Sequence, residues 1–246
     1  IKDYEDLARR LRESFGYSIV RETFNFSKPE LVQYTQLALG GDSRDRYTEY
    51  ASRLVNILNQ MHQAGVANIL DLIARIKMRE QLELFVAQSG VQAQDVVDVP
   101  KFLIYWLVPG KKYLSGLVRD DSETSHAIQE LRGLGIRTNL DLLQQGITAA
   151  GRKALAAASG LPEAVISDLV NRADFSRLPW ASKATISNII GSGYGSIAQL
   201  ANAVPEQLYA DFFSYGKTIG KNLKLGNEIE NSYRLAKIVP VLVQEG

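Results

Sequence analysis

Two aspartates and two histidines are the residues whose types and spacing first suggest acid–base or metal chemistry. Asp71 and Asp141 occupy equivalent positions in two similar segments and could form a carboxylate pair. Each stands beside leucines near the expected start of a short helix, so helix capping or a solvent-facing position is the favoured interpretation. His62 and His126 are expected to be partly exposed, because neither has a serine, cysteine or second histidine in a hydrolase or metal pattern.

A glycine-rich run and the cysteine count bear on the same question. The run GSGYG at 191–195 is spaced like a dinucleotide-binding loop, but no strand is expected before it and no acidic ribose ligand follows at the right distance. It therefore predicts the end of a helix. The chain contains no cysteine, which excludes disulfides, thiolate chemistry and cysteine-ligated zinc. We expect no enzymatic activity, no cofactor and no metal.

The elements that carry these residues are repeated along the chain. The segment GVANILDLI at 65–73 returns as GIRTNLDLL at 135–143, a shift of 70 residues from Gly65 to Gly135. The same shift relates later pairs such as Gly90 and Gly160, and a third copy of the spacing begins at Gly193. Duplicated helical units usually form binding surfaces rather than enclosed catalytic sites.

The periodicity predicts an all-α protein. Apolar residues recur every three or four positions, as they do from Tyr4 to Leu11, and alternating β-branched runs are essentially absent. In the first part of the chain we expect a helix at 4–15, a second from the capping box at Ser27 to about 39, and a third from a cap at 42 or 43 to 65. Further along we expect an alanine-rich helix at 148–158 that Gly160 ends, and another that residues 162–163 open. The last two expected helices run from Pro205 to about 215 and from about 217 to 238.

Two short turns carry residues that could contact phosphate. Residues 178–185, LPWASKAT, lie 70 positions after a segment that begins VPGKK at 108–112. This pattern resembles the hairpin of a helix-hairpin-helix unit, in which glycines let backbone amides approach a DNA phosphate at a helix N-terminus. With LVNRADF at 169–175, the chain resembles, over about residues 50 to 210, an uncharacterised bacterial family of tandem helix-hairpin-helix units, a domain of unknown function.

The resemblance implies four regions: an N-terminal helical region at 1–60, a diverged helix-hairpin-helix repeat at 61–120, a second repeat at 121–215, and a C-terminal helix at 216–246. The internal boundary is placed at the linker 119–122, whose Ser122 is expected to cap a helix containing His126.

Departures from the family pattern weaken the case for DNA. Trp180 and Ser182 stand where the DNA-binding members have glycine, so a side chain would hinder close approach of a phosphate. The candidates for nucleic-acid contact are Gly110, Lys111, Lys112, Ser182 and Lys183.

An aromatic cluster is the main candidate for contact with a protein. Phe102, Tyr105 and Trp106 belong to an apolar run whose counterparts in the second copy, from Arg172 to Arg177, are largely polar. The favoured interpretation is that the N-terminal helices bury this face. The alternative is an exposed patch at a protein or membrane interface, to which Trp180 would add.

Composition limits the partners. The 246 residues include 28 lysines and arginines against 27 acidic residues, a net charge of +1, and neither half of the chain is basic. Nucleic acid is thus disfavoured as the main partner. The most apolar run, 102–108, is far shorter than the roughly 20 residues that span a membrane. We expect a cytoplasmic protein for which a membrane interface and a small-molecule substrate are disfavoured.

These observations predict a non-enzymatic protein-interaction or assembly module with a protein partner. The alternative is sequence-independent DNA binding through the hairpins. An enzyme that uses a shallow pocket between the repeats is the least favoured class, because no convergent set of titratable groups is visible in the sequence.

Overall fold

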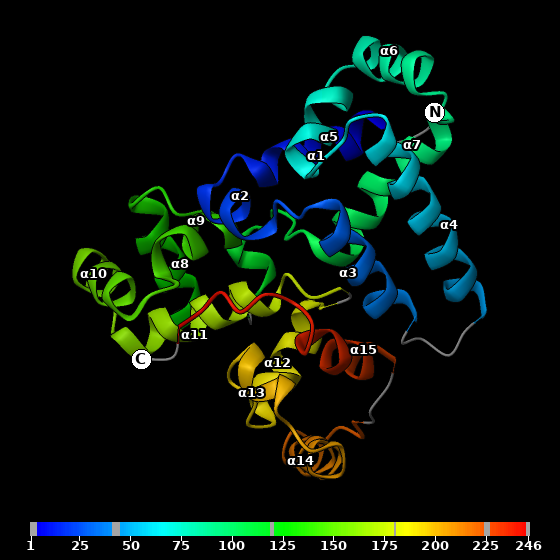
Figure 1. The fold of residues 1–246 in the computed structure, drawn as a ribbon. Coiled ribbons are helices and arrows are strands. Elements are labelled where there is room, and N and C mark those ends of the chain that lie inside the picture. Colours follow the sequence, from blue (N-terminus) through cyan, green and yellow to red (C-terminus); the bar gives the residue numbers. More distant parts are fainter. Residues whose placement is uncertain (1–3, 41–44, 119–120, 180, 224–226, 245–246) are drawn as a thin grey trace. The chain divides into compact units, whose positions relative to one another are not determined.

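The computed structural model describes residues 4–40, 45–118, 121–179, 181–223 and 227–244 (Figure 1). Within these ranges the protein is helical, with two isolated single-residue bridges and no β-strand, which confirms the all-α prediction. The chain forms two compact units, Ile1–Gly110 and Lys111–Gly246. We call them the N-terminal unit and the C-terminal unit.

The N-terminal unit is a set of helices around an apolar core that includes Leu11, Phe24 and Phe102. Its first helix buries the apolar stripe that its sequence predicts, including Tyr4, Leu7 and Leu11. The elements are α1 (Tyr4–Phe15), α2 (Ser18–Phe24), α3 (Lys28–Gly40), α4 (Asp45–Gln63), α5 (Ile69–Ile76), α6 (Arg79–Ser89), α7 (Ala93–Phe102) and a π-helical turn, η1 (Leu103–Leu107).

The C-terminal unit has a second core, which includes Leu140, Ile166 and Phe212. Its elements are the 3₁₀ turn η2 (Leu114–Gly116), α8 (Ser122–Gly133), α9 (Asn139–Gly146), α10 (Ala149–Ser159), α11 (Glu163–Phe175), α12 (Lys183–Gly191), α13 (Ile197–Ala201), α14 (Pro205–Thr218) and α15 (Asn227–Ala236).

The 70-residue shift is visible in the helices themselves. Helices α5, α6 and α7 begin at 69, 79 and 93, and α9, α10 and α11 begin at 139, 149 and 163. The glycines that end the preceding helices are left-handed in both copies, with φ of 85° at Gly65 and 83° at Gly135. Since L-residues with a side chain rarely adopt this conformation, glycine is what allows the turn at these positions.

Three predicted helix ends in the C-terminal unit are wrong. The helix from Pro205 does not stop at 215, because Gly216 is buried inside α14 and the left-handed residue that follows the helix is Gly220. The next described helix begins at Asn227 rather than at about 217. Helix α8 is capped by Asp121, whose carboxylate accepts the Thr124 amide at 2.8 Å, and not by Ser122. A cap at 42 or 43 lies outside the described residues.

Different ends of the chain cover the two copies of the repeat. In the N-terminal unit, α1 packs on α5 and α7, and the Tyr4 hydroxyl donates to the carbonyl of Ile76. The counterpart of that carbonyl is Gly146 O, to which the buried Arg152 donates at 3.3 Å. Arg152 also donates to Gln244 O at 3.0 Å, so a C-terminal extended segment lies against the repeat in the C-terminal unit.

Candidate functional site

The two aspartates that resembled a carboxylate pair are helix caps. Asp141 accepts the amide of Thr138 at 2.8 Å while the Thr138 hydroxyl accepts the Asp141 amide at 3.2 Å, a complete capping box. Asp71 accepts the Ala67 amide at 3.1 Å, and Asn68 caps the Asp71 amide in return. These contacts confirm the structural interpretation of both carboxylates.

A third copy of the same cap begins α13. Ser196 accepts the Gln199 amide at 3.1 Å, and the Gln199 side chain accepts the Gly195 amide at 2.7 Å. The run at 191–195 therefore ends α12 and starts this cap, with φ of 98° at Gly193, as the C-cap prediction requires. No phosphate loop is formed there.

The turn between α11 and α12 places one phosphate candidate in a structural role. Ser182 is the N-cap of α12, because its hydroxyl accepts the Thr185 amide at 3.1 Å and also contacts the Thr185 hydroxyl. Lys183 follows as the first residue of α12 and is half-buried. The candidate Trp180 lies outside the described residues.

Lys112 is also held by internal contacts. Its ammonium donates to the carbonyl of Ser176 at 2.6 Å, and its amide donates to the side-chain oxygen of Asn139 at 2.8 Å. The fully buried Asn139 returns its own amide to Lys112 O at 2.9 Å and donates its side-chain nitrogen to the Ser176 hydroxyl at 3.1 Å. This network ties the start of the C-terminal unit to α9 and α11.

The two residues before Lys112 are the other candidates in this turn. Lys111 is exposed, and Gly110 is half-buried. A Cβ placed on Gly110 would have no other atom within 4 Å, so the structure shows no steric need for glycine at this position. Lys111 and Lys112 are both exposed, but the Lys112 ammonium is already bonded to the Ser176 carbonyl, and two adjacent lysines are not the extended basic surface that phosphate binding usually needs.

The aromatic run of the N-terminal unit is mostly core. Phe102 is 1% exposed and Trp106 is 7% exposed, and the Trp106 ring packs edge-on against Tyr47 with 5.5 Å between centroids. The favoured interpretation of burial holds for these two residues, which therefore do not form an exposed patch. Tyr105 is the exception: it is 50% exposed, with the Arg10 guanidinium 5.2 Å from its ring centroid.

The polar counterparts in the C-terminal unit are buried too. Arg177 donates to the Asp174 carboxylate at 2.6 Å and to Pro240 O at 2.5 Å, which fixes the C-terminal segment to the end of α11. Burial raises the pKa of Asp174, although the Arg177 guanidinium opposes that shift. The two copies thus bury chemically different side chains at the same repeat positions.

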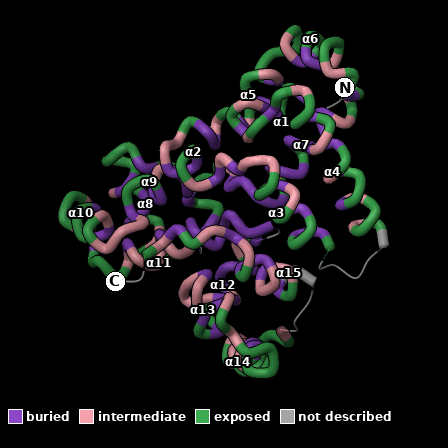
Figure 2. Tube along the Cα trace, in the orientation of Figure 1, coloured by how far each residue is buried: buried purple, intermediate pink, exposed green. Residues whose placement is uncertain are grey.

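The sequence analysis missed an exposed stripe on α14. Tyr209 is 53% exposed and Phe213 is 42% exposed, one helical turn apart, and the Lys217 ammonium lies 4.3 Å from the Phe213 ring centroid. Most of α14 is coloured as exposed in Figure 2. We call Tyr209, Phe213 and Lys217 the α14 stripe. Their spacing of four residues was the available signal, but Leu208 and Phe212 beside them suggested an ordinary buried face.

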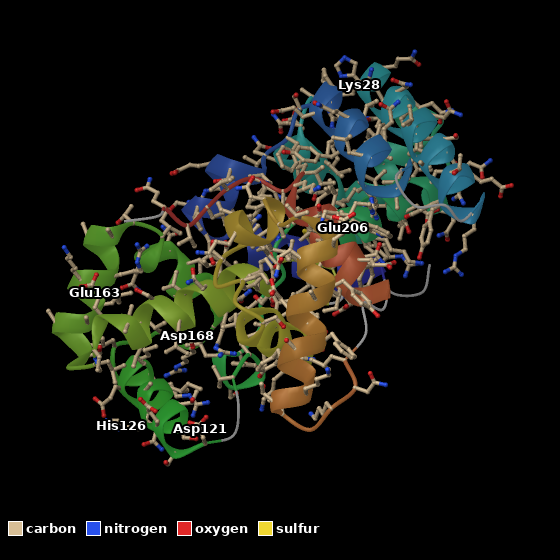
Figure 3. The ribbon with its side chains drawn as sticks, turned by 90° about the horizontal axis from the view of Figure 1, so that it is seen from below. Lys28, Asp121, His126, Glu163, Asp168 and Glu206 are labelled. Carbon is tan, nitrogen blue, oxygen red and sulfur yellow. The ribbon has the colours of Figure 1, made fainter. Side chains whose placement is uncertain are left out.

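The two histidines lie on different helices. His62 is exposed on α4, and His126 is exposed on α8, five residues after the N-cap Asp121, with its Nδ1 3.7 Å from a carboxylate oxygen of Glu130 (Figure 3). Over the described ranges, no group of three or more histidine, cysteine, aspartate or glutamate side chains could hold a metal ion. No helix in the same part of the chain combines the length and apolar character needed to cross a membrane.

A comparison with known families finds one match. A sequence profile described as "Domain of unknown function (DUF4332)" matches residues 123–222, which run from the first turn of α8 past the end of α14. No curated protein and no solved structure matches the chain. The matched description assigns no activity, so function is inferred from the structure alone.

Proposed function

We propose that this chain is a non-enzymatic, cytoplasmic protein-interaction module built of tandem helix-hairpin-helix repeats, and that its partner binds the α14 stripe. The observation that carries the proposal is the pair Tyr209 and Phe213, two large aromatic side chains exposed next to each other on one helix face. Aromatic side chains are enriched among the residues that dominate binding energy at protein interfaces.

The opposite face of α14 is fixed to the unit. Leu208 and Phe212 are 2% and 1% exposed. The Tyr215 ring lies so close to Gly191 that a Cβ there would be 2.2 Å from it. The Tyr194 hydroxyl donates to Asp211 at 2.7 Å. A helix held in this way presents its outer aromatic side chains with little additional loss of conformational entropy on binding.

The short connection from α11 to α12 supports the helix-hairpin-helix part of the proposal, since the two helices are separated only by residues 176–182. Sequence-independent DNA binding has weaker support. Ser182 and Lys112 are engaged in internal hydrogen bonds, and the C-terminal unit has no large excess of basic residues.

The proposal is tested by co-purification from native extract with the full chain and two double variants. In Tyr209→Ser with Phe213→Ser the partner should be lost. In the control Tyr113→Ser with Val241→Ser, which removes two other side chains that are 66% and 73% exposed in the same unit, the partner should be retained. The size of the recombinant chain is measured in parallel.

The proposal is contradicted if the protein is strictly monomeric and retrieves no partner. It is also contradicted if both double variants retain the partner equally. Binding to duplex DNA at low salt that falls steeply with salt, and weakens in Lys111→Glu and Lys183→Glu, would establish the DNA alternative instead.

A further inference from the structure

A cavity of about 460 Å³ opens in the N-terminal unit between the first turn of α1 and helix α6. Its volume lies in the range of small-ligand and peptide side-chain pockets, roughly 300–1,000 Å³. Tyr4 and Leu82, which are 6% and 2% exposed, form its apolar base, and Val86, Ala87 and Ala93 form its sides. An apolar side chain of moderate size would be desolvated there.

The repeat shows how the lining of this cavity differs from the equivalent place in the C-terminal unit. The counterpart of Leu82 is Arg152, whose longer side chain bonds to Gly146, Ile147 and Gln244 in the C-terminal unit. Leucine at this position ends at its methyl groups, and the Tyr4 hydroxyl takes over the contact with the Ile76 carbonyl. At this position the N-terminal unit therefore has Leu82 and Tyr4, both of which line the cavity, where the C-terminal unit has the Arg152 guanidinium and its bond to the C-terminal segment.

The rim of the cavity is acidic. Glu5, Asp6 and Glu83 line it, against a single basic residue, Arg79. Asp6 pairs with Arg9 at 2.5 Å and Glu83 with Arg79 at 3.1 Å, whereas Glu5 takes part in neither pair. This charge belongs to the N-terminal copy, because the counterparts of Arg79 and Glu83 in the C-terminal unit are alanine and lysine.

We infer that this cavity binds a basic, apolar segment of a partner polypeptide. An apolar side chain enters between Tyr4 and Leu82, and a neighbouring lysine or arginine faces Glu5. The acidic rim selects for cations and opposes phosphate groups, so nucleic acid and anionic lipid are unsuitable occupants. The inference goes beyond the proposed function, since it concerns a different unit and a different surface from the α14 stripe.

Anisotropy titrations with short fluorescein-labelled peptides test the inference on the full chain. The probe alternates leucine and lysine, and its two controls alternate leucine with glutamate and serine with lysine. The leucine–lysine peptide should bind and the controls should not. Ala87→Trp, an exposed position at the cavity wall, should weaken binding by about tenfold or more, the effect of losing one anchor residue.

The matched control is Ala157→Trp, the exposed counterpart of Ala87 in the C-terminal unit, which should leave binding unchanged. Glu5→Gln should weaken binding by about two- to fivefold, as expected for one solvent-exposed ion pair. The inference is overturned by failure of the leucine–lysine peptide to bind, by equal binding to Ala87→Trp, or by equal binding of the leucine–glutamate peptide. The double variant Tyr209→Ser with Phe213→Ser should bind the peptide as the unchanged protein does. Loss of peptide binding at the cavity can therefore be distinguished from loss of partner binding at the α14 stripe.

Discussion

At the same point of the repeat, the N-terminal unit buries Trp106 and Leu107, and the C-terminal unit buries Ser176 and Arg177. In the first pair, the Trp106 ring packs against Tyr47 of α4. In the second pair, the Ser176 hydroxyl accepts a hydrogen bond from Asn139. Arg177 donates to the Asp174 carboxylate and to the carbonyl of Pro240 in the C-terminal segment. One helical path therefore accepts two kinds of interior. The polar one is held by bonds from Arg177 Nε and Nη2, although the buried Nη1 of the same side chain has no hydrogen-bond partner.

The largest expected effect comes from breaking the polar interior. Arg177→Ala leaves Asp174 buried without its cation and removes the bond to Pro240, which should lower the free energy of unfolding by about 3–5 kcal/mol. Chemical denaturation of the full chain measures this loss of stability. Limited proteolysis detects the release of the C-terminal segment.

The same comparison can be sharpened by transplanting the apolar interior. Asp174→Ile with Arg177→Leu gives the C-terminal unit the residues found 70 positions earlier, at Ile104 and Leu107. Since a buried ion pair can often be replaced by apolar residues at little cost, this double variant should be more stable than Arg177→Ala. A double variant that is less stable than Arg177→Ala would show that the two interiors are not interchangeable.

A glycine marks a smaller difference in packing. Gly146 is the counterpart of the buried Ile76, and a Cβ on Gly146 would lie 2.6 Å from a methyl carbon of Val170. Gly146→Ala should cost about 1–3 kcal/mol of stability through overpacking of α9 against α11. Thermal unfolding checks the loss, and Gly133→Ala, where a Cβ meets nothing within 4 Å, serves as the control.

The caps should behave alike in the two copies. Thr138→Ala and Asn68→Ala each remove the acceptor of a helix N-terminal amide, and each should cost about 1 kcal/mol. Equal losses in denaturation would support a common role for the two caps. A loss confined to one variant would mean that the surrounding packing, and not the cap, fixes the other turn.

The smallest effect is a pH dependence that belongs to the N-terminal unit. Hydrogen bonds from the Ser27 hydroxyl and amide lower the pKa of Glu30 below its usual 4.5. The cap thus contributes stability above pH 4.5 that is lost as pH falls through the lowered pKa. Ser27 forms a single-residue β-bridge with Asn68, and in the C-terminal unit the equivalent bridge joins Tyr113 to Thr138. The residue three positions after Tyr113 is Gly116, where the N-terminal unit has Glu30. Carboxyl titration by NMR should find the Glu30 pKa lowered, and Glu30→Gln should remove this part of the acid sensitivity.

Local signals predicted much of the fold. The sequence predicted the helix ends at Gly65 and Gly160, where the structure has left-handed residues, and the capping interpretation of Asp71 and Asp141 followed from their place near the start of a short helix. Gly216 could not be distinguished from a helix end by sequence, because its burial inside α14 depends on residues 221 and 223, which pack against it.

The candidate site was less predictable for the same kind of reason. The role of Lys112 depends on the tertiary position of Ser176, 64 residues away, and could not be read from the sequence. Ser182 is different, because its contact with the Thr185 amide is local to the first turn of α12. The α14 stripe was hidden because α14 has aromatic side chains on both faces, and the fold decides which face is buried.

The most direct test of the central claim places a photo-crosslinking benzoylphenylalanine at Tyr209, with Tyr113 as the matched exposed tyrosine. Irradiation in native extract should give a discrete covalent adduct with one protein from position 209 and none from position 113. The account is contradicted if position 209 gives no adduct, or if both positions give the same set of products.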